Sequence, residues 1–309
     1  MGRLVELGDA RILRPDRLRW LRAIAWMFAL AALMLIVFIA VNSVVILIGA
    51  TIHHTSVSDP KLLPPIYRAA ALLLATAAVF ASYVAAVRLG EARRPSELAP
   101  RALLPELAIG LAVGATVMIA TGAILWATGW GSFHWQPVSA ITRALSGSIQ
   151  SGVVEEIVFR LIILRLIWRA AGPWWALAVS AALFGGLHLG NPNATVFAAV
   201  CIAFEAGIML AAFYILTGRL WMSIGVHAGW NFTQGWLLGA AVSGGGGGLA
   251  GGPLVHTPTA GVSEILSGGA FGPEASLPAL MLCTAVGAGV LWVAWKRGRM
   301  DEDAVVADA

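Results

Sequence analysis

The chain has 309 residues, of which 59% are hydrophobic and 12% are charged. Soluble globular domains carry about 25% charged residues, so this composition excludes an ordinary soluble protein and indicates a polytopic membrane protein. The formal net charge of +4 does not indicate a nucleic-acid partner, because the arginines stand at the edges of apolar runs, as membrane topology requires. We therefore expect a lipid bilayer around a single integral membrane domain spanning residues 1–309.

Eight apolar runs predict membrane helices, since most of them approach or exceed the roughly 18 to 20 residues that a spanning helix needs. In chain order they cover residues 20–50, 67–89, 103–128, 148–170, 174–188, 194–216, 220–240 and 277–295. The segment 137–170 is too long for one straight span, so we expect a break near Ser146 and Gly147. The predicted fold class is all-α, a polytopic membrane helix bundle with about eight transmembrane helices.

The loops of this bundle predict its orientation. If both termini are cytoplasmic, sixteen of the twenty Lys and Arg residues fall on cytoplasmic segments, which satisfies the positive-inside rule. We therefore expect a multi-pass protein of the bacterial inner (cytoplasmic) membrane with both termini inside. The motif-bearing core is expected at about residues 146–240. A glycine-rich stretch that begins at Ser243 predicts a flexible loop over about residues 241–276.

The run 148–170 contains two carboxylates and an arginine in apolar surroundings. A charged side chain at the centre of a bilayer costs about 2.5 to 3.5 kcal/mol, so such residues are usually paired and functional. Glu156 and Arg160 are four residues apart, acid first, which favours an ion pair on one helix. One arginine cannot compensate two carboxylates. Glu155, on the same face as Ser148 and Ser151, is therefore the predicted free acid.

Three further polar side chains occur on two later apolar runs, 174–188 and 220–240. His188 ends the run 174–188, while His227 and Asn231 are four apart on the run 220–240. A rise of about 1.5 Å per residue puts all of them at depths that overlap with Glu155. We therefore expect one site between three helices.

The residues of this site permit two hydrolytic schemes. Glu155, His188 and His227 could hold a zinc ion with a water in the open position. Alternatively, Glu155 could act as the general base on a water, while the histidines and Asn231 stabilise an oxyanion. The cofactor is accordingly either none or zinc, since the spacing of the residues fits both schemes.

Three motifs carry a resemblance to a known family. They are E-E-x-x-x-R at Glu155, Glu156 and Arg160, F-x-x-x-H from Phe184 to His188, and H-x-x-x-N from His227 to Asn231. In this order, on successive apolar helices, they resemble the CPBP family, the group of CAAX prenyl proteases and bacteriocin-processing proteins also called type II CAAX proteases. The resemblance implies an eight-helix intramembrane endopeptidase.

The same resemblance implies roles and a substrate class. The first motif glutamate, Glu155, would activate water; Glu156 and Arg160 would orient the site; and the three later residues, His188, His227 and Asn231, would bind a metal or stabilise the oxyanion. The expected substrate is a membrane-embedded or lipid-modified peptide or protein.

Two other functions use the same kinds of residue. A transporter or proton-coupled carrier also needs intramembrane acids and histidines, but carriers often have two related halves. Here the polar residues crowd into residues 146–231, with no equivalent in the first half of the chain. The other alternative is a non-catalytic membrane scaffold. Glu205, outside the motifs, is interpreted as a structural carboxyl paired with a neighbouring helix.

Overall fold

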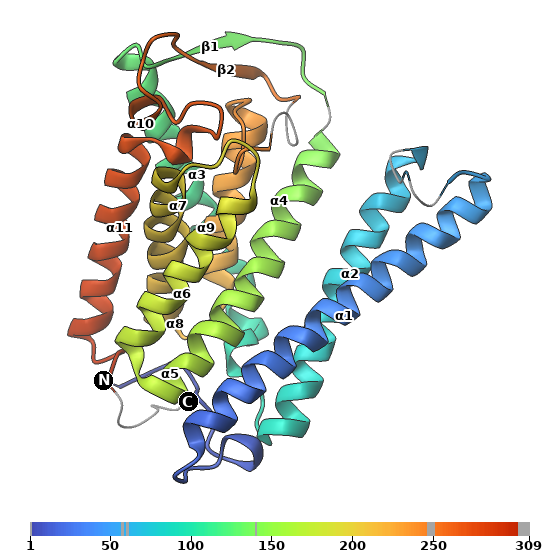
Figure 1. The fold of residues 1–309 in the computed structure, drawn as a ribbon, viewed down its shortest axis with the longest axis vertical. Coiled ribbons are helices and arrows are strands. Elements are labelled where there is room, and N and C mark those ends of the chain that lie inside the picture. Colours follow the sequence, from blue (N-terminus) through green and yellow to red (C-terminus); the bar gives the residue numbers. More distant parts are fainter. Residues whose placement is uncertain (1, 57–58, 60–61, 140, 246–250, 302–309) are drawn as a thin grey trace.

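A computed structural model describes residues 2–56, 59, 62–139, 141–245 and 251–301. The protein is a bundle of helices that run alternately in opposite directions, and the start of α1 and the end of α11 lie at the same end of the bundle (Figure 1). We call this end the lower end, as drawn, and the opposite end the upper end. The all-α fold class is therefore confirmed.

Most of the helices match the predicted runs to within a few residues, but the helix expected over residues 148–170 begins earlier, at Ile141, and α10 was not predicted. The helices are α1 (Arg19–His53), α2 (Pro65–Ala86), α3 (Leu103–Ala127), α4 (Ile141–Glu156), α5 (Arg165–Ala171), α6 (Pro173–Leu187), α7 (Val196–Ile202), α8 (Leu210–Thr217), α9 (Trp221–Phe232), α10 (Glu264–Ser267) and α11 (Leu277–Lys296). Four π-helical segments extend or join them: Val87–Glu91 after α2, Ile157–Leu164 between α4 and α5, Ala203–Met209 between α7 and α8, and Thr233–Leu237 after α9.

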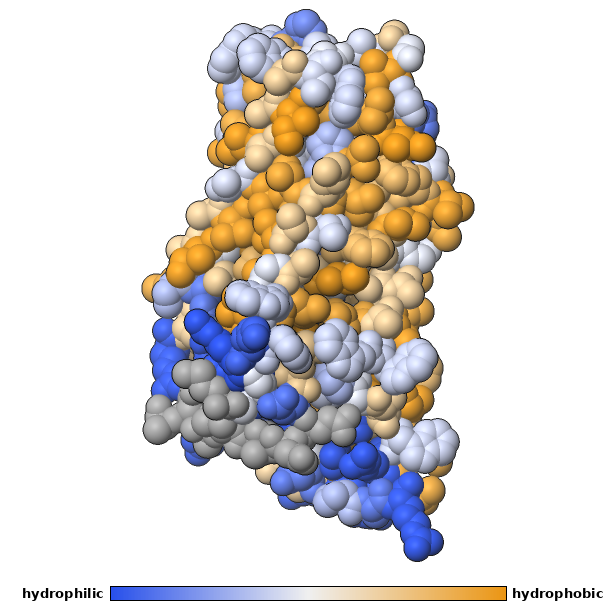
Figure 2. Space-filling model, turned by 90° about the vertical axis from the view of Figure 1, so that its left-hand side faces the viewer, coloured by the Kyte–Doolittle hydropathy of each residue, from blue (hydrophilic) through white to orange (hydrophobic). Residues whose placement is uncertain are grey.

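The surface of the bundle is that of a multi-pass membrane protein. Five helices of the described chain are long and apolar enough to cross a bilayer, in the ranges Arg19–His53, Pro65–Glu91, Ser96–Ala127, Val196–Thr217 and Leu277–Lys296. On the face that Figure 2 shows, hydrophobic residues form a broad band across the middle, and strongly hydrophilic residues lie toward the lower end. The predicted number of about eight spans stays a prediction, because α6, for example, has only 15 residues.

The expected break near Ser146 and Gly147 is wrong. The helix runs without interruption from Ile141 through the π-helical segment to Ala171. The physical reason is that backbone groups in lipid must be hydrogen-bonded within the helix, and a helical glycine costs only about 1 kcal/mol. The two carboxylates therefore lie near the middle of one long helix.

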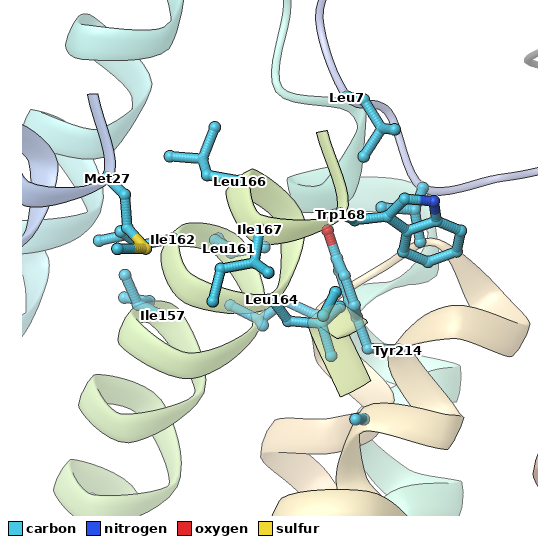
Figure 3. Packing of buried hydrophobic residues seen from close by; sticks show 14 of the residues in the cluster. Leu7, Met27, Ile157, Leu161, Ile162, Leu164, Leu166, Ile167, Trp168 and Tyr214 are labelled. Carbon is cyan, nitrogen blue, oxygen red and sulfur yellow. The ribbon is translucent and has the colours of Figure 1, made fainter. Parts of the chain in front are cut away.

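The α4–α5 helix forms the centre of the main apolar core. In Figure 3, Ile157, Leu161 and Leu164 from this helix pack between Met27 of α1 and Tyr214 of α8. All three aliphatic side chains are fully buried. Apolar residues that contact several helices at once fix the long helix within the bundle and so set the height of the carboxylates.

Helices α3 and α9 cross with their backbones in contact. Gly110 and Gly114 on α3 face Gly225 and Gly229 on α9. A Cβ atom added at Gly110 would meet backbone atoms of α9 at 2.5 Å, and one added at Gly229 would meet the backbone of α3 at 2.5 Å. Small residues spaced by four on both helices permit such close approach in membrane proteins. This crossing fixes α9, which carries two of the predicted site residues.

A buried ion pair ties the α1–α2 hairpin to α5 at the lower end. Arg165 donates two hydrogen bonds to Glu91, at 2.9 and 2.7 Å, and both side chains are fully buried. Trp26 of α1 donates to the same carboxylate at 2.9 Å. Sequence reasoning treated Arg165 only as a topology signal, since its partner is 74 residues away.

A small sheet covers the upper end. Strands β1 (Gly131–Trp135) and β2 (Leu254–Pro258) pair antiparallel, with Gly131 opposite Pro258 and Trp135 opposite Leu254. Residues 251–276, expected as part of a flexible loop, thus contain β2 and α10; the glycines at 246–248 lie outside the described residues. Neither strand was predicted, because their partners are far apart in the sequence.

Candidate active site

The ion pair predicted on α4 is present in the structure. Arg160 donates to Glu156 from Nε at 2.7 Å and from Nη2 at 3.2 Å, and both side chains are fully buried. Two further guanidinium hydrogens reach carbonyl oxygens of Ala206, at 2.5 Å, and Gly207, at 3.2 Å. Bonding of this kind compensates the cost of burying both charges. Glu156 is therefore held in one place.

His227 lies between the two carboxylates. Its Nδ1 is 3.1 Å from Oε1 of Glu156, and its Nε2 is 4.0 Å from Oε2 of Glu155. A carboxylate that already accepts from Arg160 is an acceptor, so Nδ1 carries the proton and donates. In the neutral imidazole, Nε2 then presents a lone pair toward Glu155.

Glu155 differs from Glu156 in its exposure. The Glu155 side chain is 34% exposed, whereas that of Glu156 is not exposed at all. The adjacent residues lie on different faces of the helix because successive residues turn by about 100°. Glu155 consequently points into open space, with an imidazole nitrogen as its nearest basic neighbour.

His188 follows α6 at the start of a short 3₁₀ turn, His188–Gly190. Its Nδ1 lies 2.7 Å from the carbonyl oxygen of Phe184, and the two rings stack with centroids 5.2 Å apart. The carbonyl can only accept, so Nδ1 donates here too. This contact leaves the Nε2 of His188 as the nitrogen that is available to a ligand.

Asn231 is oriented by the serine face of α4. Its side-chain nitrogen donates to Oγ of Ser151 at 2.8 Å, and this hydroxyl donates to the Gly147 carbonyl at 3.1 Å. Gly152 permits the approach, since a Cβ there would meet the backbone nitrogen of Ala228 on α9 at 3.1 Å. The second hydrogen of the Asn231 amide has no partner among the described residues, and the side chain borders the cavity.

These side chains border one cavity of about 480 Å³. Glu155, His188, His227 and Asn231 all line it. Further lining residues come from the loop after α6 and the loop after α9. Asn193 in the first loop donates to the carbonyl oxygen of Gly244 in the second at 3.4 Å. The structure therefore brings together the four residues that the sequence predicts to share a site.

The donor groups fit a metal only in part. Both histidines direct Nδ1 at an oxygen and leave Nε2 free, as metal-ligating histidines do. However, within the described ranges no group of three His, Cys, Asp or Glu side chains is close enough to hold a metal ion. As arranged, Glu155, His188 and His227 do not fit a three-ligand zinc site.

A second, smaller cavity adjoins the site. It measures about 30 Å³, room for about one water molecule, and its lining includes Glu205 and Glu274 together with His188 and His227. Both Glu205 oxygens are buried without a hydrogen-bond partner in the described chain. The expected pairing of Glu205 with a neighbouring helix is therefore wrong.

Glu274 was missed by sequence reasoning. It lies just before α11 and is 2% exposed. It accepts a hydrogen bond from the backbone nitrogen of Ser243, which joins the loop after α9 to the start of α11. Burial raises its pKa to about 7. Nothing near Glu274 in the sequence separates it from a surface acid.

The comparisons with known proteins agree with this site. Residues 137–233 match the family model described as "Type II CAAX prenyl endopeptidase Rce1-like". The matched segment contains all three motifs and the four residues that line the larger cavity. Neither the curated proteins nor the solved structures contain a match to the chain.

Proposed function

We propose that this protein is a membrane protease that hydrolyses a peptide bond with water activated by Glu155, a proposal that the match of residues 137–233 to the Rce1-like type II CAAX prenyl endopeptidase model supports. The observation that carries the proposal is the pair of acceptors that face each other across the cavity, Oε2 of Glu155 and Nε2 of His227, 4.0 Å apart.

A water molecule between these two atoms can donate one hydrogen bond to each of them. Its oxygen lone pair then points away from both acceptors, toward the open cavity. In the reaction, Glu155 takes one proton from the water molecule as the water oxygen bonds to the peptide carbonyl carbon. Glu155 later gives that proton to the leaving amine as the carbon–nitrogen bond breaks. The carboxylate is thereby regenerated.

Asn231 is the proposed donor to the oxyanion. Of its two amide hydrogens, one is used by Ser151, and the other can stabilise the negative oxygen of the tetrahedral intermediate. His188, by contrast, directs its Nδ1 hydrogen at the carbonyl oxygen of Phe184. We therefore assign His188 to substrate positioning, supported by its stacking on Phe184.

Glu156 and Arg160 are positioning residues in this scheme. Glu156 holds the proton of His227 on Nδ1, and Arg160 keeps Glu156 ionised and in place. Together they direct the lone pair of His227 toward the water. No step passes through a metal ion, because the described side chains do not converge on one.

The test compares Glu155→Gln with Glu264→Gln, which changes an acid in the upper loops away from the cavity. Membranes containing each variant are compared with wild type by peptidomics, and purified proteins are assayed on the peptides so found. We expect Glu155→Gln to reduce cleavage by about 10²- to 10⁴-fold, the range for loss of a general base, and Glu264→Gln to leave it unchanged.

Undiminished cleavage by Glu155→Gln would refute the assignment. A chelator arm separates the two hydrolytic schemes: we expect full activity in its presence. Loss of activity that zinc restores would replace the glutamate scheme with a metal-dependent one while keeping the peptidase function.

A further inference from the structure

A cavity of about 240 Å³ lies at the lower end of the bundle. The N-terminal segment contributes Arg3 and Leu7 to its walls, the start of α1 contributes Arg19, and the end of α5 contributes residues 168–172. Figure 1 shows the start of α1 and the α5 helix at this end. None of these residues lines the cavity that contains Glu155, so the lower cavity is separate from the proposed peptidase site.

The walls of the lower cavity are positively charged. Arg3, Arg19 and Arg169 line it, and no Asp or Glu is among its described lining residues. Arg169 is repelled by Arg19 and Arg22 and attracted by Asp9. An anion inside the cavity would attract Arg19 and Arg169 at once and offset the repulsion between them.

Two neighbouring residues of α5 hold hydrogen-bond donors at this cavity. Arg169 donates from Nη2 to the carbonyl oxygen of Leu13 at 2.7 Å, which fixes its guanidinium. The Nε of Arg169 and the indole Nε1 of Trp168 are both buried without an acceptor in the described chain. Trp168 is only 2% exposed, and Figure 3 shows it next to Leu7 of the N-terminal segment. Buried donors without acceptors are costly, so the chemistry of the walls favours a ligand rich in acceptor oxygens.

The helix ends at the cavity do not set the sign of its potential. Gly172 directly follows α5 and directly precedes α6. The negative end of one helix dipole therefore meets the positive end of the next, and the two largely offset each other. The arginine side chains are left to determine which ligands the cavity attracts.

Exposed tryptophans place the cavity at the level of the lipid headgroups. Trp20 follows Arg19 on α1, and Trp174 and Trp175 follow Gly172 at the start of α6; all three indoles are exposed. Tryptophan is enriched at the boundary between lipid and water. The phosphate groups of phospholipids lie at the same level, and basic pockets between membrane helices bind anionic headgroups.

We infer that the lower cavity binds the phosphate group of an acidic phospholipid headgroup through Arg19 and Arg169, with Arg3 at its wall. The planar fork of an arginine matches the oxygens of a phosphate. An acidic headgroup fits better than a zwitterionic one, because it brings no ammonium group toward the arginines. A lipid bound there would connect the N-terminal segment with α1 and α5.

The inference is tested on purified protein in an uncharged detergent, by following thermal unfolding during titration with phosphatidylglycerol or phosphatidylcholine. The cavity variants are Arg19→Gln and Arg169→Gln. Arg101→Gln is the matched control, since Arg101 is an exposed arginine outside the cavity. Loss of one charge-assisted hydrogen bond predicts phosphatidylglycerol binding that is weaker by about tenfold or more in each cavity variant. The affinity of Arg101→Gln should equal that of wild type.

Arg19→Gln keeps the test valid even if Arg169→Gln fails to fold. Arg19 is exposed and begins α1, where a positive charge opposes the helix dipole. Without lipid, the unfolding temperature of Arg19→Gln should therefore equal or exceed that of wild type. If Arg19→Gln binds phosphatidylglycerol as tightly as wild type and Arg101→Gln do, the inference is overturned. Equal stabilisation of wild type by phosphatidylcholine and phosphatidylglycerol would also overturn it.

An arm with inorganic phosphate and no lipid separates the two sources of the anionic group. We expect inorganic phosphate to leave the unfolding temperatures of wild type and Arg19→Gln equally unaffected, because a free ion lacks the acyl chains that hold a headgroup at the cavity. Stabilisation of wild type by inorganic phosphate that is lost in Arg19→Gln would keep the phosphate site but overturn its assignment to a lipid.

Discussion

The crossing of α3 and α9 gives a prediction that links packing to the site. Gly114 on α3 is the perturbation point, because α9 carries His227 and Asn231. A Cβ atom at Gly114 would lie 2.8 Å from the backbone nitrogen of Trp230, and nearer still to the carbonyl oxygen of Val226, where ordinary contact begins at 3.4 Å. Gly114→Ala must therefore push the two backbones apart by at least 0.6 Å.

This displacement should affect both stability and catalysis. Overpacking of a closely packed contact costs about 1 to 3 kcal/mol. A shift of about 1 Å in a catalytic group can cost on the order of 10²-fold in rate. We therefore expect Gly114→Ala to fold with a lowered unfolding temperature in detergent and to cleave peptide roughly 10- to 100-fold more slowly than wild type.

Gly289→Ala on α11 is the matched control, since its added methyl group meets nothing within 4 Å. It should keep full activity, and its stability should rise slightly because alanine favours the helix. The reasoning fails if Gly114→Ala matches Gly289→Ala in both unfolding temperature and turnover.

Two further predictions concern buried charges. Arg160→Met leaves Glu156 buried with only His227 as partner, so we expect a loss of about 3 to 5 kcal/mol in stability. The double variant Arg160→Met with Glu156→Gln should recover much of this loss. If thermal unfolding shows no recovery in the double variant, the argument is contradicted. Burial raises the pKa of Glu274 from 4.5 to about 7, so the folded state loses stability as the pH rises between these values, by up to about 3 kcal/mol at 1.36 kcal/mol per unit. The free energy of unfolding measured at pH 4.5 and 7.5 should fall with rising pH in wild type, and the part of this fall that Glu274 causes should be absent in Glu274→Gln. An equal fall in both proteins would refute the prediction.

Much of the fold follows from local patterns in the sequence. The helices appear as apolar runs, and the Glu156–Arg160 pair follows from a spacing of four on one helix. The meeting of Glu155, His188, His227 and Asn231 follows from depth and helix faces.

The features that were missed depend on partners distant in sequence. Glu91 and Arg165 look like ordinary charges at helix ends until the fold brings them together. The pairing of β1 with β2 is invisible for the same reason. The break that the sequence predicts near Ser146 and Gly147 is absent, because in lipid the cost of freeing the backbone exceeds the cost of a helical glycine.

The π-helical segment Ile157–Leu164 has a consequence for comparing this chain with others. Each π turn holds an additional residue relative to an α-helix, so it rotates everything after it out of phase with a helical wheel drawn from Glu155. The segment lets one helix direct Glu155 into the cavity and Arg165 toward Glu91. Deleting one residue here would restore the regular pitch and misdirect one of these two ends. Chain length in this segment is thus constrained in addition to the identity of its buried side chains.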